Sequence, residues 1–191
     1  MVKFTRMIKN LLLLILFCIA SVQLEAQVDV FEAARSGNIP QLKAMFALDA
    51  DTINKENHSG HTPLIIAAYN NQLQAVNFLL ENGADVSSQF DQGSALHGAA
   101  FKGYLEVVKV LVNYKAKVNE KDSNGTTPLI YATLFSHNEI AKLLVEKGGD
   151  PTIKDNTGQS ALTYAKQLKN EVLLHLFMKC ATNKIPDYEN D

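Results

Sequence analysis

The sequence predicts an all-α solenoid in which helix–turn–helix units with short hairpin fingers stack on one another. Four similar segments carry a leucine at the same place, 32, 33 and 33 residues apart: Leu64, Leu96, Leu129 and Leu162. A residue suited to helix capping stands two positions before each leucine. Units of this length cannot bury their apolar faces alone, so we expect them to stack and to bury the four leucines in equivalent places.

The first 26 residues have the pattern of a secretory signal peptide. Basic residues between Lys3 and Lys9 precede an unbroken apolar run over residues 11–20, and Ala26 is a small residue at a suitable cleavage point. A transmembrane anchor needs about 20 apolar residues, which is twice the length of this run. We therefore expect cleavage after Ala26, with Ala20 as the alternative site, and a periplasmic or secreted protein.

The repeat region is expected to cover residues 27–180, and a polar tail is expected to follow at 181–191. Its units are expected at residues 28–56, 57–90, 91–121, 122–154 and 155–180. The first unit is degenerate: its Ala33-Ala34 pair lies 34 residues before Ala67-Ala68, and no finger precedes it. Terminal units differ from the others in such stacks, because each exposes one face to water.

Each unit should contain two helices with recognisable ends. Thr62 and Thr127 are suited to cap the first helix, and proline follows each of them at a position where a missing N–H costs nothing. The apolar residues of the second helix recur at offsets of three and four and share one face; in the second unit they are Leu73, Val76, Leu79 and Leu80. Gly83 and Gly148 are expected to end second helices with a left-handed φ.

Several of these motifs resemble those of the ankyrin repeat: Thr62-Pro63-Leu64, Thr127-Pro128-Leu129, Gly83-Ala84-Asp85 and the histidine at position 97. The resemblance, which extends to small exported bacterial ankyrin proteins, implies a concave face, lined by fingers and first helices, that binds another protein. It also suggests a role beside an envelope enzyme or a toxin. Two departures stand out: Lys115 occupies the place of a turn glycine, and the third finger lacks one residue before Ser94.

The resemblance places partner-contacting positions directly after the Ala-Ala pair and on the fingers. After the pair, the candidates are Tyr69, Asn70, Phe101, Lys102, Leu134 and Phe135. On the fingers, they are His58, Ser59, His61, Phe90, Gln92, Ser123, Asn124 and Thr126. Tyr69, Phe101 and either Leu134 or Phe135 would form an apolar strip if they face the concave side. The alternatives are that these side chains pack between units as core, and that the fingers are ordinary solvated hairpins.

Composition excludes several classes of function. Loss of the leader removes three basic residues and one acidic residue, which takes the formal net charge from −2 to −4. This charge argues against nucleic acid and against an anionic membrane surface as partners. We find no nucleophile elbow, phosphate-binding loop or paired carboxylates, and we expect no metal or cofactor. Cys180, the cysteine that remains after cleavage, is expected to lie beyond the last helix.

We therefore expect a monomeric, non-enzymatic scaffold that supports, inhibits or tethers an envelope or secreted protein. Two alternatives remain open. A metal- or thiol-dependent enzyme would use His58 and His61, or Cys180, but this histidine pair flanks a turn with no third ligand nearby in sequence. His97, at the motif position, is expected to brace its own turn by hydrogen bonding. A membrane-tethered adaptor would keep its N-terminus uncleaved.

Overall fold

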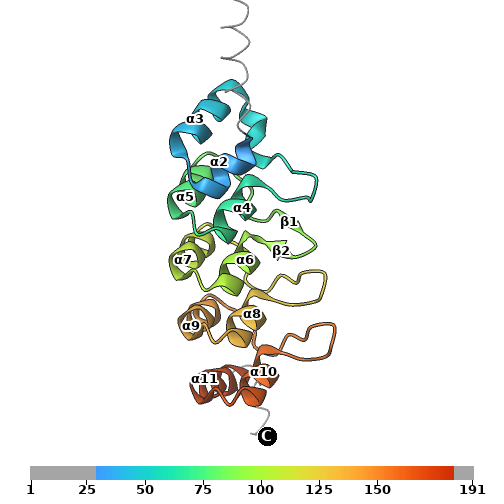
Figure 1. Cartoon of the computed structure of the whole chain (residues 1–191). Coiled ribbons are helices and arrows are strands. Elements are labelled where there is room, and N and C mark those ends of the chain that lie inside the picture. The colour runs from blue at the N-terminus through green and yellow to red at the C-terminus, as the bar shows by residue number, and fades with distance from the viewer. Residues whose placement is uncertain (1–28, 183–191) are drawn as a thin grey trace, which may run out of the picture.

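The computed structural model describes residues 29–182, which form one stack of paired helices (Figure 1). The pairs are α2 (Val30–Ser36) with α3 (Ile39–Leu48), α4 (Pro63–Tyr69) with α5 (Leu73–Glu81), α6 (Ala95–Lys102) with α7 (Leu105–Asn113), α8 (Pro128–Leu134) with α9 (Asn138–Glu146), and α10 (Ala161–Gln167) with α11 (Glu171–Thr182). A short 3-10 helix, η1 (Ala50–Asn54), follows α3. The expected all-α stack with hairpin fingers is confirmed. The expected signal peptide lies outside the described residues, as does the tail beyond Thr182.

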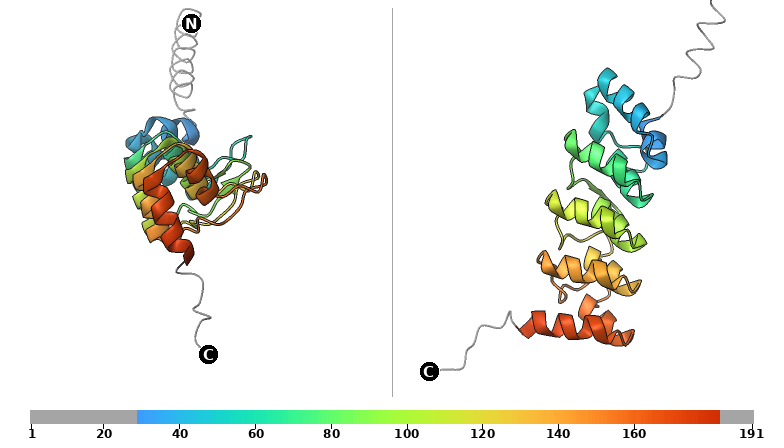
Figure 2. Two further views of the ribbon diagram at one scale, coloured as in Figure 1. Left: turned by 90° about the horizontal axis from the view of Figure 1, so that it is seen from below. Right: turned by 90° about the vertical axis from the view of Figure 1, so that its left-hand side faces the viewer.

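The first helix of each pair lies beside the fingers, and the second helices form an outer layer (Figure 2). Leu64, Leu96 and Leu129 are at most 1% exposed, as expected for the inner face of stacked units. The expectation that Leu162 is equally buried is wrong, because it is only half-buried. Leu162 belongs to the last pair of helices that the structure describes, and no described unit follows to cover it.

The predicted helix starts and stops are present. The Oγ1 atoms of Thr62 and Thr127 accept hydrogen bonds from the backbone amides three residues ahead, at 3.4 and 3.3 Å. Gly83 and Gly148 both have φ near +92°, in the left-handed region that ends the second helices. Lys115 adopts φ +68° at the equivalent place, although its Cβ makes this conformation costly.

The third finger closes differently from its neighbours. It is a tight antiparallel hairpin of β1 (Gln89–Phe90) and β2 (Gly93–Ser94), joined by a two-residue loop. In the other fingers the Oδ1 atom of Asn57, Asp122 or Asp155 accepts two backbone N–H groups of the turn. The third finger has one residue fewer, so that wider turn cannot form, and Phe90 stands where the others have the turn-forming side chain.

Successive fingers are joined into a wall beside the first helices. The amide of Ser123 donates to the carbonyl of Asp91 at 3.0 Å, and the amide of Asn156 donates to the carbonyl of Asn124 at 2.9 Å. The Nδ2 atom of Asn156 also donates to the carbonyl of Ser123. These bonds between units link the third, fourth and fifth fingers directly to one another.

The last helix is longer than the sequence indicated. Helix α11 continues to Thr182, so Cys180 lies within it and is half-buried; the expectation that Cys180 lies beyond the helix is wrong. No glycine or proline interrupts residues 171–182, and the helix has no reason to stop earlier. Within residues 29–182, no helix has the length and apolar character needed to cross a membrane.

Candidate protein-binding groove

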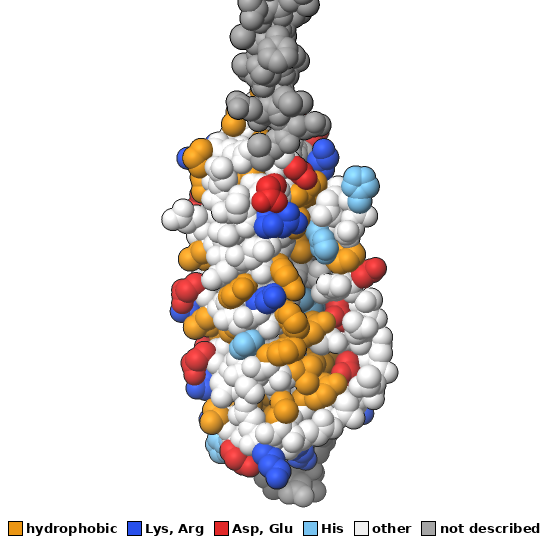
Figure 3. Space-filling view, viewed as in Figure 1, with side chains coloured by type: hydrophobic (Ala, Val, Ile, Leu, Met, Phe, Trp, Pro, Cys, Tyr) orange, Lys and Arg blue, Asp and Glu red, His pale blue; other side chains and the backbone are white. Residues whose placement is uncertain are grey.

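A groove of about 550 Å³ lies between the fingers and the first helices of the central units. It is lined by Arg35, His61, Ile65, Ile66, Tyr69, Asn70, Phe90, Gln92, Gly93, Ser94, His97, Gly98, Phe101, Asn124 and Tyr131. Hydrophobic side chains gather along the middle of this face, between the helices and the fingers (Figure 3). The groove is open to solvent, and its walls come from α2, α4, α6 and α8 on one side and from three fingers on the other.

Three aromatic residues from successive units, Tyr69, Phe101 and Phe135, form a continuous aromatic strip along this face. The rings of Tyr69 and Phe101 are nearly parallel with centroids 6.4 Å apart, and those of Phe101 and Phe135 meet edge to face at 4.7 Å. Tyr69 is 42% exposed and Phe135 49%, whereas Phe101 between them is half-buried. The strip is therefore partly supported by its own ring contacts and partly open to solvent.

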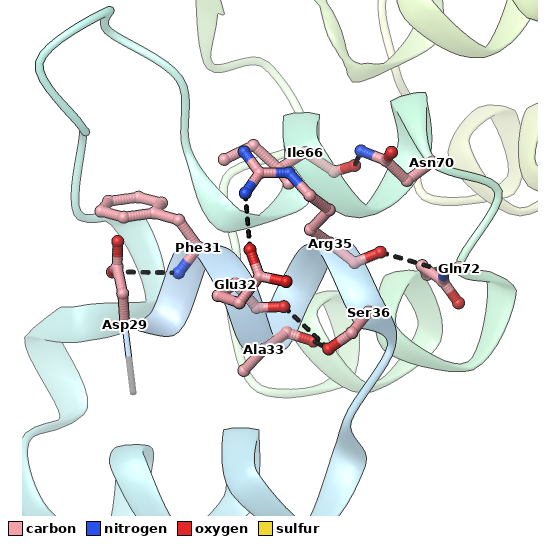
Figure 4. A network of polar contacts seen from close by, with 9 residues as sticks. All are labelled: Asp29, Phe31, Glu32, Ala33, Arg35, Ser36, Ile66, Asn70 and Gln72. Atoms are coloured by element: carbon pink, nitrogen blue, oxygen red, sulfur yellow. Dashed lines mark hydrogen bonds and ion pairs between the residues drawn. The ribbon is translucent and has the colours of Figure 1, made fainter. Parts of the chain in front are cut away.

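The charged side chains at the groove are cationic. The Nζ atom of Lys102 lies 4.5 Å above the ring centroid of Tyr69 and 5.6 Å from that of Phe101, which is cation–π geometry. Arg35 forms a 2.7 Å ion pair with Glu32 beside α4 (Figure 4). Both partners of this pair are more than half exposed, so the pair is weak and its arginine can exchange partners. No aspartate or glutamate is among the groove-lining residues named above.

His97 braces the floor of the groove, as its motif position predicts. The backbone amide of Ser94 donates to His97 Nδ1 at 3.1 Å, so the imidazole proton lies on Nε2, which donates to the carbonyl of Glu120 at 3.1 Å. Burial lowers the pKa of His97 below its ordinary value, despite opposing effects of Asp122 and Glu120. His97 is therefore a neutral structural group that ties α6 to the segment leading into the next finger.

Tyr131 closes the groove at its C-terminal end. Its hydroxyl donates to Asp122 Oδ2 at 2.7 Å, and burial together with this carboxylate raises the pKa of Tyr131 to about 12. The next unit repeats the contact: the Tyr164 hydroxyl donates to Asp155 Oδ2 at 2.8 Å. Burial alone would raise the pKa of Asp155, but hydrogen bonds from Thr157, Tyr164 and backbone amides outweigh it and lower the pKa. These pairs tie each finger to its own first helix.

The sequence candidates fall into four groups. The groove is lined by Tyr69, Asn70, Phe101, His61, Phe90, Gln92 and Asn124. The exposed candidates outside the lining are Lys102, Phe135, His58, Ser59 and Ser123. Leu134 is half-buried and packs against the core. Thr126 is only 8% exposed, so its assignment as a contact residue is wrong; it lies inside the finger, directly before the cap of α8.

Sequence reasoning missed part of the helical wall: Ile66, Gly98 and Tyr131. Each lies three residues before one of the predicted positions Tyr69, Phe101 and Leu134. Residues three apart share a helix face, so this spacing could have identified all three.

The histidine pair has no metal-site geometry. His61 packs edge to face on Phe90, with ring centroids 4.2 Å apart, and His58 is exposed on the finger. Among residues 29–182 no group of three or more His, Cys, Asp or Glu side chains is placed to hold a metal ion. One histidine of this finger therefore packs on a neighbouring ring, and the other faces solvent.

Comparisons with known proteins identify the repeat. A family model described as ankyrin repeats (3 copies) matches residues 30–122 and 96–187. The chain is 37% identical over 101 residues to ankyrin repeat and SAM domain-containing protein 6 of Rattus norvegicus, which covers 52% of this chain and 11% of that protein. It is 44% identical over 75 residues to the B-cell lymphoma 3 protein homolog of Mus musculus, which covers 39% of this chain and 17% of that protein.

The chain thus spans less than a fifth of the length of either relative. The family model, by contrast, covers nearly all of the residues that the structure describes. The chain belongs to the ankyrin repeat family, whose members are generally protein-interaction scaffolds without enzymatic activity.

Proposed function

We propose that this protein is an exported scaffold that binds another protein through the groove and thereby supports, inhibits or tethers an envelope or secreted partner. The observation that carries the proposal is the aromatic strip of Tyr69, Phe101 and Phe135. Exposed apolar clusters of this kind are unusual on a surface that meets only water. Aromatic side chains are also enriched among the residues that contribute most to binding energy.

The rigidity of the groove favours binding. The strip is seated at the ends of α4, α6 and α8, and no buried side-chain polar atom among the described residues lacks a partner. Ordering of this surface should therefore cost little free energy when a partner binds, because the rings already hold their positions against one another. The cationic Lys102 beside Tyr69 adds a polar contact at the edge of the apolar area.

A pull-down from an envelope fraction tests the proposal. The bait is the whole chain, compared with a triple variant carrying Tyr69→Ala, Phe101→Ala and Phe135→Ala. The matched control carries Leu48→Ala, Tyr114→Ala and Val172→Ala, which removes exposed apolar side chains that neither line the groove nor belong to the aromatic strip. We expect a discrete partner with the wild type and the control, and its loss with the groove variant. Equal capture by all three baits would contradict the proposal.

Export is the second part of the proposal, and it is supported by the basic start and the short apolar run of the leader. Intact-mass measurement of the protein recovered outside the cytoplasm tests it. We expect a mass that lacks residues 1–26. An unchanged mass would instead favour an anchored adaptor.

A further inference from the structure

We propose that the third unit carries an anchor pocket at Gly98, and that this pocket receives one aromatic or large aliphatic side chain from a partner segment rich in carboxylates. The inference rests on the proposed function, because it names the chemistry of the segment that the groove binds. It depends on two departures from the repeat that meet at one place.

The first departure is the glycine in α6. Gly98 occupies the position that holds Ile66 in the second unit, Tyr131 in the fourth and Tyr164 in the fifth. Its φ is outside the left-handed region, so the backbone conformation does not require glycine. Glycine weakens a helix interior relative to alanine. A glycine here lets the Tyr69 ring approach the backbone of α6, and it leaves the place of the larger side chains of the other units open to the groove.

The second departure is Phe90 on the shortened finger. In the fourth and fifth units a finger aspartate accepts a hydrogen bond from the tyrosine of the first helix, at 2.7 and 2.8 Å, and this pair closes the gap between finger and helix. In the third unit both partners are replaced: Phe90 stands for the aspartate and Gly98 for the tyrosine. The gap is therefore open, and both residues line the groove.

The walls of this opening are apolar. The three atoms nearest to a Cβ atom built on Gly98 all belong to Tyr69, with the ring Cδ2 atom at 3.3 Å, so the half-exposed Tyr69 ring forms the wall directly against the glycine. Phe90 packs on His61, and Phe101 lies one helical turn after Gly98. An aromatic side chain buries roughly 150–250 Å² and suits a pocket lined by rings.

The charged residues around the pocket indicate the composition of the rest of the partner segment. Lys102 has its ammonium group over Tyr69, at the edge of the pocket, and it forms no ion pair with a carboxylate of residues 29–182. The nearby Asp122 is buried and already accepts bonds from Tyr131 and from two backbone amides. A partner carboxylate next to the anchor side chain would therefore meet Lys102, and Arg35 lies further along the same groove.

A peptide-display selection tests this inference. A library of random 12-residue peptides is selected on the whole chain, and in parallel on a Gly98→Leu variant whose side chain fills the opening. We expect the wild type to enrich peptides that combine an aromatic or large aliphatic residue with neighbouring Asp or Glu. The Gly98→Leu variant should bind these peptides at least tenfold more weakly.

Three further variants separate the effect of filling the pocket from misfolding and from a general effect of charge. Gly98→Ala should weaken peptide binding with little change in melting temperature, since its Cβ presses on the half-exposed Tyr69 ring and narrows the opening while alanine favours the helix. Lys102→Glu should weaken binding, whereas Lys109→Glu, the same charge change on outer helix α7, should not. Enrichment of no peptide, of peptides without this composition, or of peptides that bind Gly98→Leu equally well would overturn the proposal.

The test also distinguishes this inference from the proposed function. If capture in the pull-down depends on the aromatic strip but not on Gly98→Leu, the proposed scaffold function stands and the anchor pocket is contradicted.

The sequence of this chain contains Asp187-Tyr188-Glu189, which combines an aromatic residue with carboxylates, so a labelled peptide of residues 183–191 is included in the test. If the peptide of residues 183–191 binds the groove as tightly as the peptides from the selection, the groove is occupied by a second copy of this chain. That result would overturn the proposal of a different protein as the partner.

Discussion

The Nε2 atom of His97 lies 3.1 Å from the carbonyl oxygen of Glu120, and this contact joins α6 to the start of the next finger. The same imidazole accepts the amide of Ser94 through Nδ1. Because both ring nitrogens are engaged in the neutral form, protonation of His97 would break the Ser94 bond and place a charge in a buried site. His97 therefore links the pH to the stability of the stack.

Stability should fall on mild acidification. The pKa of folded His97 lies below its ordinary value of 6.5, mainly because of burial. Below pH 6.5 His97 binds a proton in the unfolded chain but not in the folded chain. The contribution of neutral His97 to the free energy of unfolding is therefore fully present above this pH, and it is lost as the pH falls towards the pKa of folded His97. The slope is at most about 1.4 kcal/mol per pH unit. Urea unfolding at pH 7.5 and pH 5 measures it, and His97→Gln should reduce it.

Loss of the Tyr131 hydroxyl should cost more stability than loss of the Tyr164 hydroxyl. Tyr131→Phe leaves the buried Asp122 carboxylate short of one donor, at a cost of about 1–3 kcal/mol. Asp155 is more exposed than Asp122, so water can replace the lost donor in Tyr164→Phe. Chemical denaturation of both variants measures the difference. Equal decreases in the free energy of unfolding for Tyr131→Phe and Tyr164→Phe would contradict the difference in burial between Asp122 and Asp155.

The interior and the terminal leucine should respond differently to truncation. Leu96→Ala removes a fully buried side chain and should destabilise the protein by about 2–5 kcal/mol. Leu162→Ala affects the half-buried equivalent and should cost clearly less. Thermal unfolding of both variants is the measurement. A larger loss at Leu162 would contradict the difference in burial between the two leucines.

Lys115 offers a route to a more stable protein. Its φ of +68° is favourable for glycine and costs an L-residue about 1–2 kcal/mol, so Lys115→Gly should stabilise the fold by about 1 kcal/mol after the added flexibility of the unfolded chain. Lys121→Gly, at an exposed position without left-handed φ, is the control and should not stabilise it. The midpoints of urea unfolding compare the two variants.

Much of the fold follows from local chemistry in the sequence. The repeat of Leu64, Leu96 and Leu129, the threonine caps and the turn glycines each correspond to a contact or dihedral angle in the structure. The place of Lys115 in the repeat is likewise enough to predict its strained turn. The caps and the turn glycines are local features that one unit is enough to predict, whereas the leucine pattern and the place of Lys115 require a comparison of several units.

The errors concern residues whose environment depends on other units. Leu162 follows the leucine pattern but has no described unit to cover it, and Thr126 lies in a finger but points into it. Within the groove, the open gap at Gly98 and Phe90 depends on how a finger and a helix of the same unit meet. That arrangement becomes visible only when the tyrosine–aspartate pairs of the fourth and fifth units are compared with it.

Site-specific photo-cross-linking tests the central claim most directly, because it captures a bound partner of any identity. A photoreactive phenylalanine analogue is placed at Phe135 in the aromatic strip, or at Tyr114, an exposed aromatic residue outside the strip, at the end of outer helix α7. In the native host, Phe135 should give a discrete cross-linked species on illumination and Tyr114 should give none. A cross-link from Tyr114 with none from Phe135 would show that the protein binds its partner through another face.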